Sequence, residues 1–162
     1  MDAHSTWARA PLPALIEHIS SEHHARTRSE LSHAAEAVER LAVTDAEREP
    51  RLIELARRLR SFAGEMRVHM HRESSALFPA LATIERPLHR DVSTSIRIMQ
   101  CDHDEALQVL KRLRTLTDHY TPPPGASRTF VETFAALARV DAAVVEAIDL
   151  ENELLYGRLL TR

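Results

Sequence analysis

The stretch His69-Met70-His71-Arg72-Glu73-Ser74-Ser75-Ala76-Leu77-Phe78-Pro79 places two ionisable side chains inside an apolar helical pattern. His69 and Glu73 lie four residues apart, so an α-helix would present both on one face. Apolar residues extend that face in both directions in steps of three and four: Leu52, Leu55, Leu59, Phe62, Met66, Ala76 and Ala80. Burying a lone carboxylate in such a seam is costly. We therefore expect Glu73 to have a partner there, and a metal ion is a natural one.

The composition excludes several classes of protein. A net charge of −3, with both signs interspersed, gives no basic surface for nucleic acid. No apolar run approaches the ~20 residues of a membrane span, and no signal-like segment follows Met1. Cys101 is the only cysteine, which rules out an intrachain disulfide and a thiolate metal site within one chain. We expect a cytoplasmic protein that binds neither nucleic acid nor membrane.

Four periodic segments separated by short breaks predict four long helices. They span residues 13–41, 50–82, 89–117 and 127–160. The run Pro122-Pro123-Pro124-Gly125 cannot continue a helix, and Ser127 is a good N-cap for the last segment. Long helices joined by short connections are typical of antiparallel neighbours. We predict an all-α protein, an antiparallel up-down-up-down four-helix bundle. It would form one domain over residues 1–162, with its core at 12–160 and its oligomeric state open.

The other three helices carry residues of metal-ligand type at the same predicted depth as His69 and Glu73. In an antiparallel pair, residues equally far from the turn lie side by side, and this relation aligns His24, His103 and Glu151 with the pair. Ala147 lies one turn before Glu151. Three imidazoles and two carboxylates suit iron, manganese or zinc, and carboxylates able to bridge suggest a two-metal centre. A bundle without metal is the alternative.

Periodicity leaves some positions near this centre undecided. His23 and His24 each continue one apolar face of the first helix, so the pattern does not choose between them. His18 lies about a turn and a half nearer the N-terminus, next to the centre or at its mouth. Two acids flank His103 and are candidates to accept a hydrogen bond from its ring: Asp102 and Glu105.

Five short motifs, in their order along the chain, resemble the hemerythrin-like HHE cation-binding domain, and within it the iron–sulfur cluster repair di-iron proteins. They are L-I-E-H-I at 15–19 with His24 after it, H-M-x-x-E-x-x-x-L-F-P at 69–79, D-H-D-E at 102–105, T-P-P-P at 121–124 and L-E-N-E-L-L at 150–155. The resemblance implies a four-helix bundle around a non-haem di-iron (Fe) centre. Position by position, the resemblance implies that the terminal ligands are His24, His69 and His103. It implies that the bridging carboxylates are Glu73 and Glu151.

Two departures from the family pattern bear on function. The family's fourth-helix motif begins with a histidine where this chain has Ala147, so one iron would lack an imidazole. Water could fill that position, only one metal could bind well, or a neighbouring side chain could substitute, the candidates being Glu146, Asp149 and His71. The repair proteins also usually carry an N-terminal domain with a cysteine pair, and this sequence contains no such pair.

The resemblance leads to two functional hypotheses. The first is an iron-binding protein of the nitric oxide or oxidative stress response, whose partners are damaged iron–sulfur proteins. The second is a hemerythrin-like sensor or binding module that takes up O₂ or NO at the iron. Because the sequence has no phosphate loop, nucleophile elbow or Cys-x-x-Cys motif, we expect a binding or repair protein rather than a defined catalyst.

Overall fold

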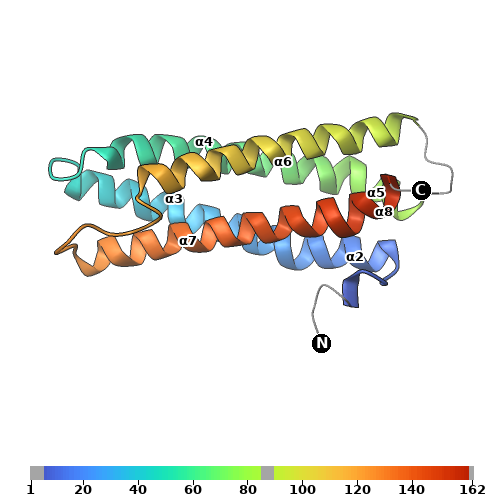
Figure 1. Cartoon of the computed structure of the whole chain (residues 1–162), viewed down its shortest axis with the longest axis horizontal. Coiled ribbons are helices and arrows are strands. Elements are labelled where there is room, and N and C mark those ends of the chain that lie inside the picture. The colour runs from blue at the N-terminus through green and yellow to red at the C-terminus, as the bar shows by residue number, and fades with distance from the viewer. Residues whose placement is uncertain (1–5, 85–89, 161–162) are drawn as a thin grey trace.

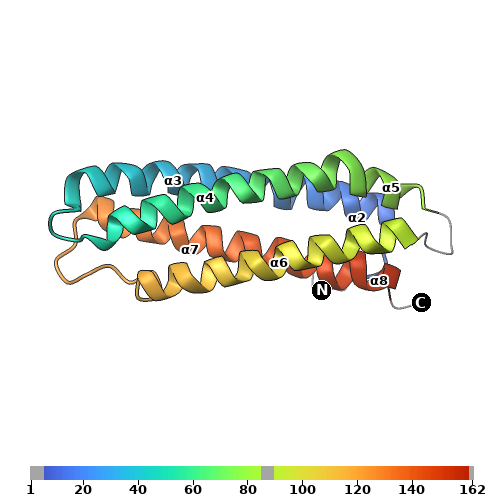
Figure 2. The same cartoon turned by 90° about the horizontal axis from the view of Figure 1, so that it is seen from above.

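The computed structural model describes residues 6–84 and 90–160, which form four long helical rods lying side by side (Figures 1 and 2). The first rod consists of α2 (Leu12–His18), η1 (Ile19–His24) and α3 (Ala25–Asp45), and the second of α4 (Arg51–Arg72), η2 (Glu73–Leu77) and α5 (Phe78–Ala82). The third rod is α6 (Arg90–Leu116), and the fourth consists of α7 (Arg128–Asp149), η3 (Leu150–Tyr156) and α8 (Gly157–Leu160). These bounds lie within a few residues of the predicted ones, although the predicted start at residue 89 lies outside the described residues.

The rods pack as a closed square of antiparallel neighbours. Helix α3 packs against α4 and α7, and α6 packs against the same two helices from the opposite side. Each rod runs opposite to the one before it, so α2 and α8 lie at the same end of the molecule (Figure 1). This arrangement confirms the predicted all-α, up-down-up-down bundle. No helix in the described part of the chain is long and apolar enough to cross a membrane.

The connection between α6 and α7 has an unusual backbone. Asp118, His119 and Tyr120 all have left-handed φ angles, of 49°, 54° and 62°. Non-glycine residues rarely adopt this region, so other contacts must stabilise the turn. The Thr117 hydroxyl accepts a hydrogen bond from the Tyr120 amide at 3.1 Å, and the Tyr120 phenol donates to Asp141 at 2.5 Å. The next helix begins as predicted, because the Ser127 side chain caps α7.

The bundle interior consists of two apolar clusters separated by a polar layer. One cluster fills the end near α2 and α8, and its members include Leu15, Ile19, Leu81, Ile96 and Leu155. The other fills the remaining length, and its members include Leu31, Leu59, Phe62, Leu110 and Val140. Along every rod, the change from one cluster to the other falls at a buried polar residue: His24, His69 and Glu73, His103, or Glu151. The fold therefore brings four separate chain segments to one polar layer between two apolar clusters.

Three of the four rods contain a π-helical segment at this layer, namely η1, η2 and η3. A π-turn accommodates one more residue than an α-turn, so it rotates the following residues onto a new face. After Glu73 the buried positions become Leu77, Phe78 and Leu81, whereas Ala76 and Ala80 are exposed. The predicted seam is therefore wrong beyond Glu73, because it assumed an unbroken α-helical period.

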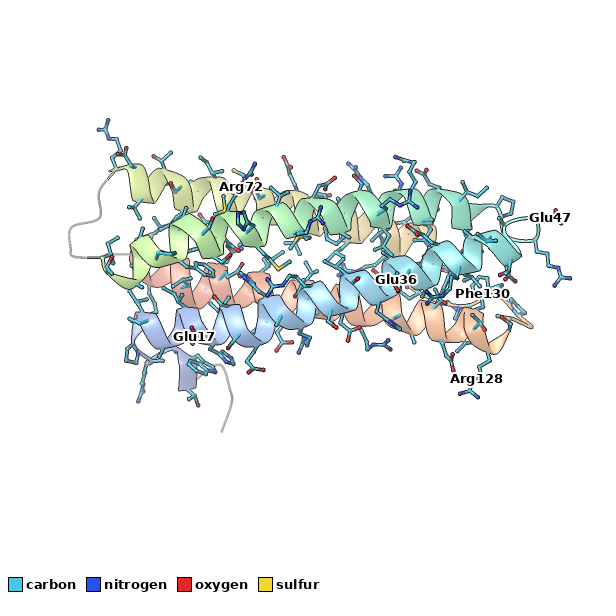
Figure 3. The ribbon with its side chains drawn as sticks, turned by 180° about the vertical axis from the view of Figure 1, so that it is seen from behind. Glu17, Glu36, Glu47, Arg72, Arg128 and Phe130 are labelled. Atoms are coloured by element: carbon cyan, nitrogen blue, oxygen red, sulfur yellow. The ribbon has the colours of Figure 1, made fainter. Side chains whose placement is uncertain are left out.

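The outer surface carries the charged residues. Arg128 points away from the bundle in Figure 3, and Glu17, Arg72 and Arg128 are all exposed. Phe130, in the first turn of α7, is instead 3% exposed and belongs to the larger apolar cluster. This alternation along the rods is what an amphipathic helix requires when one stripe faces a core.

Candidate metal centre

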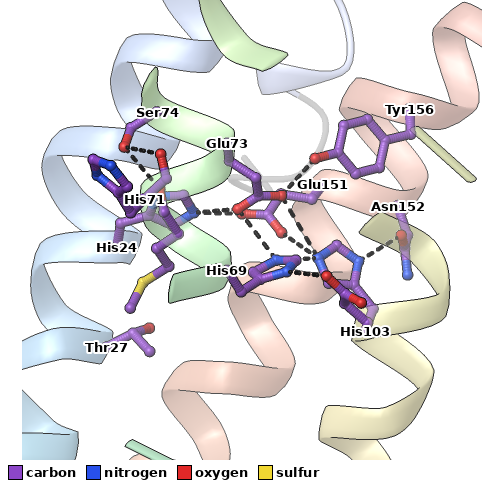
Figure 4. A network of polar contacts seen from close by, with 12 residues as sticks. His24, Thr27, His69, His71, Glu73, Ser74, His103, Glu151, Asn152 and Tyr156 are labelled. Atoms are coloured by element: carbon purple, nitrogen blue, oxygen red, sulfur yellow. Dashed lines mark hydrogen bonds and ion pairs between the residues drawn. The ribbon is translucent and has the colours of Figure 1, made fainter. Parts of the chain in front are cut away.

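The five residues predicted to form the site converge in the polar layer, one or two from each rod (Figure 4). From η1, Nε2 of His24 lies 2.6 Å from Oε1 of Glu151 and 3.4 Å from Oε2 of Glu73. Both carboxylates sit at the edges of π-segments, Glu73 as the first residue of η2 and Glu151 as the second residue of η3. The site therefore lies where the α-helical ladders of three rods are interrupted, and such π-bulges are frequent at functional sites.

The other two imidazoles close the cluster from α4 and α6. His69 Nε2 lies 3.0 Å from His103 Nε2 and 3.3 Å from Oε2 of Glu73. His103 Nε2 lies 2.9 Å from Oε2 of Glu151. Ligand-type atoms of these four residues all lie within 4.8 Å of one another, and His24 joins them through Glu151. All five residues are buried, the most exposed being His69 at 6%.

Hydrogen bonds on the outer side of two rings orient their inner nitrogens. His103 Nδ1 lies 2.9 Å from Oδ1 of Asn152, and His69 Nδ1 lies 3.4 Å from Oδ2 of Asp102. An acceptor at Nδ1 holds the proton there, which leaves the Nε2 lone pair directed into the cluster. The assignment of Asp102 to His103 was wrong, because Asp102 faces the neighbouring helix and reaches His69. Glu105, the other predicted acceptor, is exposed.

Tyr156 completes the layer and was not predicted as part of it. Its phenol donates a hydrogen bond to Oε1 of Glu73 at 2.5 Å, and the side chain is fully buried. Tyr156 lies five residues after Glu151, a spacing that points to different faces in an α-helix and to nearly the same face in a π-helix. The π-segment η3 therefore places it, and α-helical periodicity contains no signal for it. Asn152, which accepts a hydrogen bond from His103, was not predicted as part of the site either.

The buried charges shift the pKa values of the cluster. Burial by itself raises the pKa of Glu73, but the attraction of the nearby His103 and His69 imidazoles outweighs it and holds that pKa well below its usual range. Burial lowers the pKa of His103, whereas its contacts with Glu151 and Glu73 raise it, to about 10. The pKa of His69 is also raised. Without a metal, protonated imidazoles therefore balance the carboxylates.

The donor set fits a metal cation. Oε2 of Glu73 has no hydrogen-bond partner although the side chain is fully buried, and it lies among the inward-facing imidazole nitrogens. A buried carboxylate oxygen without a hydrogen bond is costly unless a cation satisfies it. Imidazole nitrogens with carboxylate oxygens are ligands that first-row metals such as iron accept. The same cation would take the place of the imidazole protons.

The remaining histidines of the first two rods lie outside the centre. His23 and His24 are both buried, but only His24 contacts the carboxylates of the cluster. His23 instead faces His18, with 3.2 Å between their Nε2 atoms. The ambiguity that periodicity left open therefore has a physical basis, because η1 is wound so that both residues point inward on different sides. His71 is exposed.

Ala147 is buried, 5% exposed, on α7 one turn before Glu151. The three side chains named as substitutes for a histidine at this position are all exposed: Glu146, Asp149 and His71. Glu146 is also held by an ion pair with Arg26. None of the three substitutes is therefore part of the buried cluster.

One side of the centre borders a cavity. A cavity of about 720 Å³ lies between α4 and α6 and is lined by His69, Asp102 and Arg72, among other residues. Gly64 lines the same cavity, and a Cβ atom there would meet nothing within 4 Å. Small molecules could approach the His69 side of the cluster through this space.

Comparison with known proteins gives concordant matches. Residues 15–159 match the family model described as the Hemerythrin HHE cation binding domain. The iron-sulfur cluster repair protein YtfE of Yersinia pseudotuberculosis serotype IB is 32% identical over 154 residues, which are 95% of this chain and 68% of that protein. The protein of the same name from Musicola paradisiaca is 31% identical over 154 residues, with the same coverage of both chains.

Proposed function

Because the chain belongs to the hemerythrin HHE cation-binding family, we propose that its buried centre holds non-haem iron that serves the repair of iron–sulfur clusters damaged by nitric oxide or oxidants. The observation that carries this proposal is the convergence of three imidazoles and two carboxylates on one buried layer. Relatives over nearly the whole chain are named for cluster repair, which supports that role over other uses of iron.

In this proposal the residues have distinct tasks. His24, His69 and His103 would each bind iron through Nε2, and Glu73 and Glu151, which reach the layer from facing rods, would bind it through carboxylate oxygens. Asn152 and Asp102 hold the outer nitrogens of two rings. Iron bound in this centre would be the source of the metal that a damaged iron–sulfur cluster has lost. The apolar clusters cover the polar layer on its two sides along the bundle axis.

A matched pair of variants tests iron binding. His69→Gln removes one inward nitrogen, whereas His71→Gln changes an exposed histidine two residues away on the same helix. Iron per chain should fall in His69→Gln and stay at the wild-type value in His71→Gln, measured by metal analysis after anaerobic loading with ferrous iron. Equal iron content in the two variants would refute the assignment of the centre.

The repair role needs a separate assay. A [4Fe–4S] enzyme inactivated with nitric oxide is incubated with the iron-loaded protein and a reductant, and its activity is followed over time. We expect faster recovery than with the same concentration of free ferrous iron, and no such advantage with His69→Gln. Recovery no faster than with free iron would remove the repair proposal while leaving iron binding intact.

A second function is favoured by the cavity beside His69. A space that reaches the centre suits a module that binds O₂ or NO at its iron. This alternative requires a visible absorption spectrum that changes reversibly with the gas, together with no effect on cluster recovery. The two measurements therefore separate a repair protein from a sensor.

A further inference from the structure

A second pair of imidazoles lies outside the buried centre. Nε2 of His18 and Nε2 of His23 are 3.2 Å apart, at the junction of α2 and η1. They lie five positions apart along the chain, so in a regular α-helix they would point about 140° apart. The π-helical winding that begins at Ile19 brings them together. The same local distortion that directs His24 to the centre thus creates a histidine pair beside it.

The spacing of these nitrogens matches a shared ligand. Two imidazole nitrogens bound to one tetrahedral ion at their usual distance are about 3.3 Å apart. The His18 and His23 nitrogens are 3.2 Å apart and their rings are nearly perpendicular, with 82° between the planes. A metal ion can therefore be accommodated with little movement of either side chain.

His23 is buried, and one of its two ring nitrogens is unpaired. The residue is 8% exposed, and its Nδ1 has no hydrogen-bond partner. Oε1 of Glu146 lies 3.9 Å from that nitrogen, and Arg26 pairs with the same carboxylate. Coordination through Nε2 would leave the proton on Nδ1, facing Glu146. Histidine ligands of metals commonly have such a carboxylate beside the outer nitrogen.

His18 is positioned by a tryptophan. The Trp7 indole stacks on the His18 ring, with 3.9 Å between ring centroids and 10° between planes. Both residues line a cavity of about 820 Å³, whose wall also contains two arginines, Arg26 and Arg114, and five acidic residues: Glu22, Asp141, Glu146, Asp149 and Glu153. Imidazole with carboxylate or water suits zinc, nickel and copper ions.

We propose that His18 and His23 form a second metal site, which binds one divalent transition-metal ion of the zinc, nickel or copper type at the side of the bundle. It is separate from the five-residue centre, because neither histidine contacts Glu73 or Glu151 in the described hydrogen bonds and ion pairs. The proposal does not depend on iron binding or cluster repair.

Trp7 reports directly on this site, because it is the only tryptophan in the chain and lies against His18. Iron-loaded protein is titrated with Ni²⁺ while tryptophan fluorescence is recorded. We expect saturable quenching at about one ion per chain. His18→Gln and His23→Gln should each raise the Ni²⁺ concentration for half-quenching at least about tenfold. His33→Gln, at an exposed position of α3, should titrate like the wild type.

Several outcomes would overturn the second site. Quenching that does not saturate, or that needs the same Ni²⁺ concentration in all four proteins, means that the pair is only a hydrogen bond. Iron content is measured in each sample, so failure of the buried centre is seen separately. His18 is only half-buried, so His18→Gln decides the question if circular dichroism shows that His23→Gln does not fold.

Discussion

The phenol of Tyr156 donates a 2.5 Å hydrogen bond to Oε1 of Glu73 across the bundle, and Oε2 of the same carboxylate has no hydrogen-bond partner. The two oxygens of one buried side chain thus have different environments. One is satisfied by the protein, and the other faces His24 and His69 at 3.4 and 3.3 Å. Tyr156 therefore fixes the carboxylate so that its open oxygen is directed toward the proposed ligands.

Tyr156→Phe removes only the donor and keeps the buried ring. The metal-free variant should lose about 1–3 kcal/mol of unfolding free energy, because a buried charged acceptor loses its partner. Urea unfolding measures this loss. Tyr120→Phe is the matched control, since it removes another 2.5 Å hydrogen bond to a carboxylate far from the centre. Tyr120→Phe should keep the wild-type iron affinity, whereas Tyr156→Phe should bind iron more weakly, because Glu73 loses the contact that orients it. Equal iron affinity in the two variants would show that Tyr156 does not position the carboxylate.

Asn152→Ala should weaken iron binding without removing a ligand. The side chain accepts from His103 Nδ1 at 2.9 Å, and loss of such an outer acceptor typically costs 10–100-fold, as an order of magnitude, in metal affinity. Competition with a chelator of known affinity measures the change. Glu153→Ala, at the adjacent exposed position, should bind like the wild type. Equal affinity in the two variants would show that Asn152 does not orient the ring.

Metal-free protein should lose stability as the pH rises above neutrality. The pKa of His103 is about 10 in the folded protein, against an ordinary value of 6.5, so its charged form stabilises the fold. That contribution is complete below pH 6.5 and is lost as the pH rises through about 10. Urea unfolding between these values tests this. The unfolding free energy should fall less steeply with pH in His103→Gln than in the wild type. A wild-type unfolding free energy that does not change with pH over this range would contradict the raised pKa of His103.

Ala147→His tests whether the missing family histidine limits occupancy. Position 147 is buried one turn before Glu151, and the exposed neighbours do not substitute for an imidazole there. Iron content should rise from about one to about two ions per chain if the centre is of the two-metal type found in bundles. Ala135→His places the new histidine at an exposed position of α7 and should leave the iron content unchanged. If the number of iron ions per chain is unchanged in both variants, Ala147 does not control occupancy of the centre.

Asp141→Asn should destabilise the packing of α6 and the left-handed turn against α7 without affecting iron. Asp141 accepts hydrogen bonds from Arg114 at 2.7 Å and from Tyr120 at 2.5 Å, and Tyr120 belongs to the left-handed turn after α6. Weakening charge-assisted hydrogen bonds should cost about 1–3 kcal/mol. Thermal unfolding and iron analysis on the same sample check both parts. Loss of iron would mean that this contact and the buried centre are coupled.

The helical fold could be predicted because its signals are local. Apolar residues at steps of three and four define four stripes, and proline and a serine cap mark their ends. In an antiparallel bundle, the depth of a residue along the axis follows from its distance in sequence to the nearest turn. This relation aligned His24, His103 and Glu151 with His69 and Glu73. The errors begin where the winding changes, as the exposed Ala76 and Ala80 show.

The amino-acid sequence alone determined the bundle, the order of its helices and the residue types that meet at its polar layer, because periodic burial is a property of each segment. Only the tertiary structure decided which neighbour each residue contacts. Asp102 reaches His69 rather than His103, and Tyr156 reaches Glu73, because those contacts depend on the rotation of one helix against another and on π-turns that single-helix periodicity does not encode.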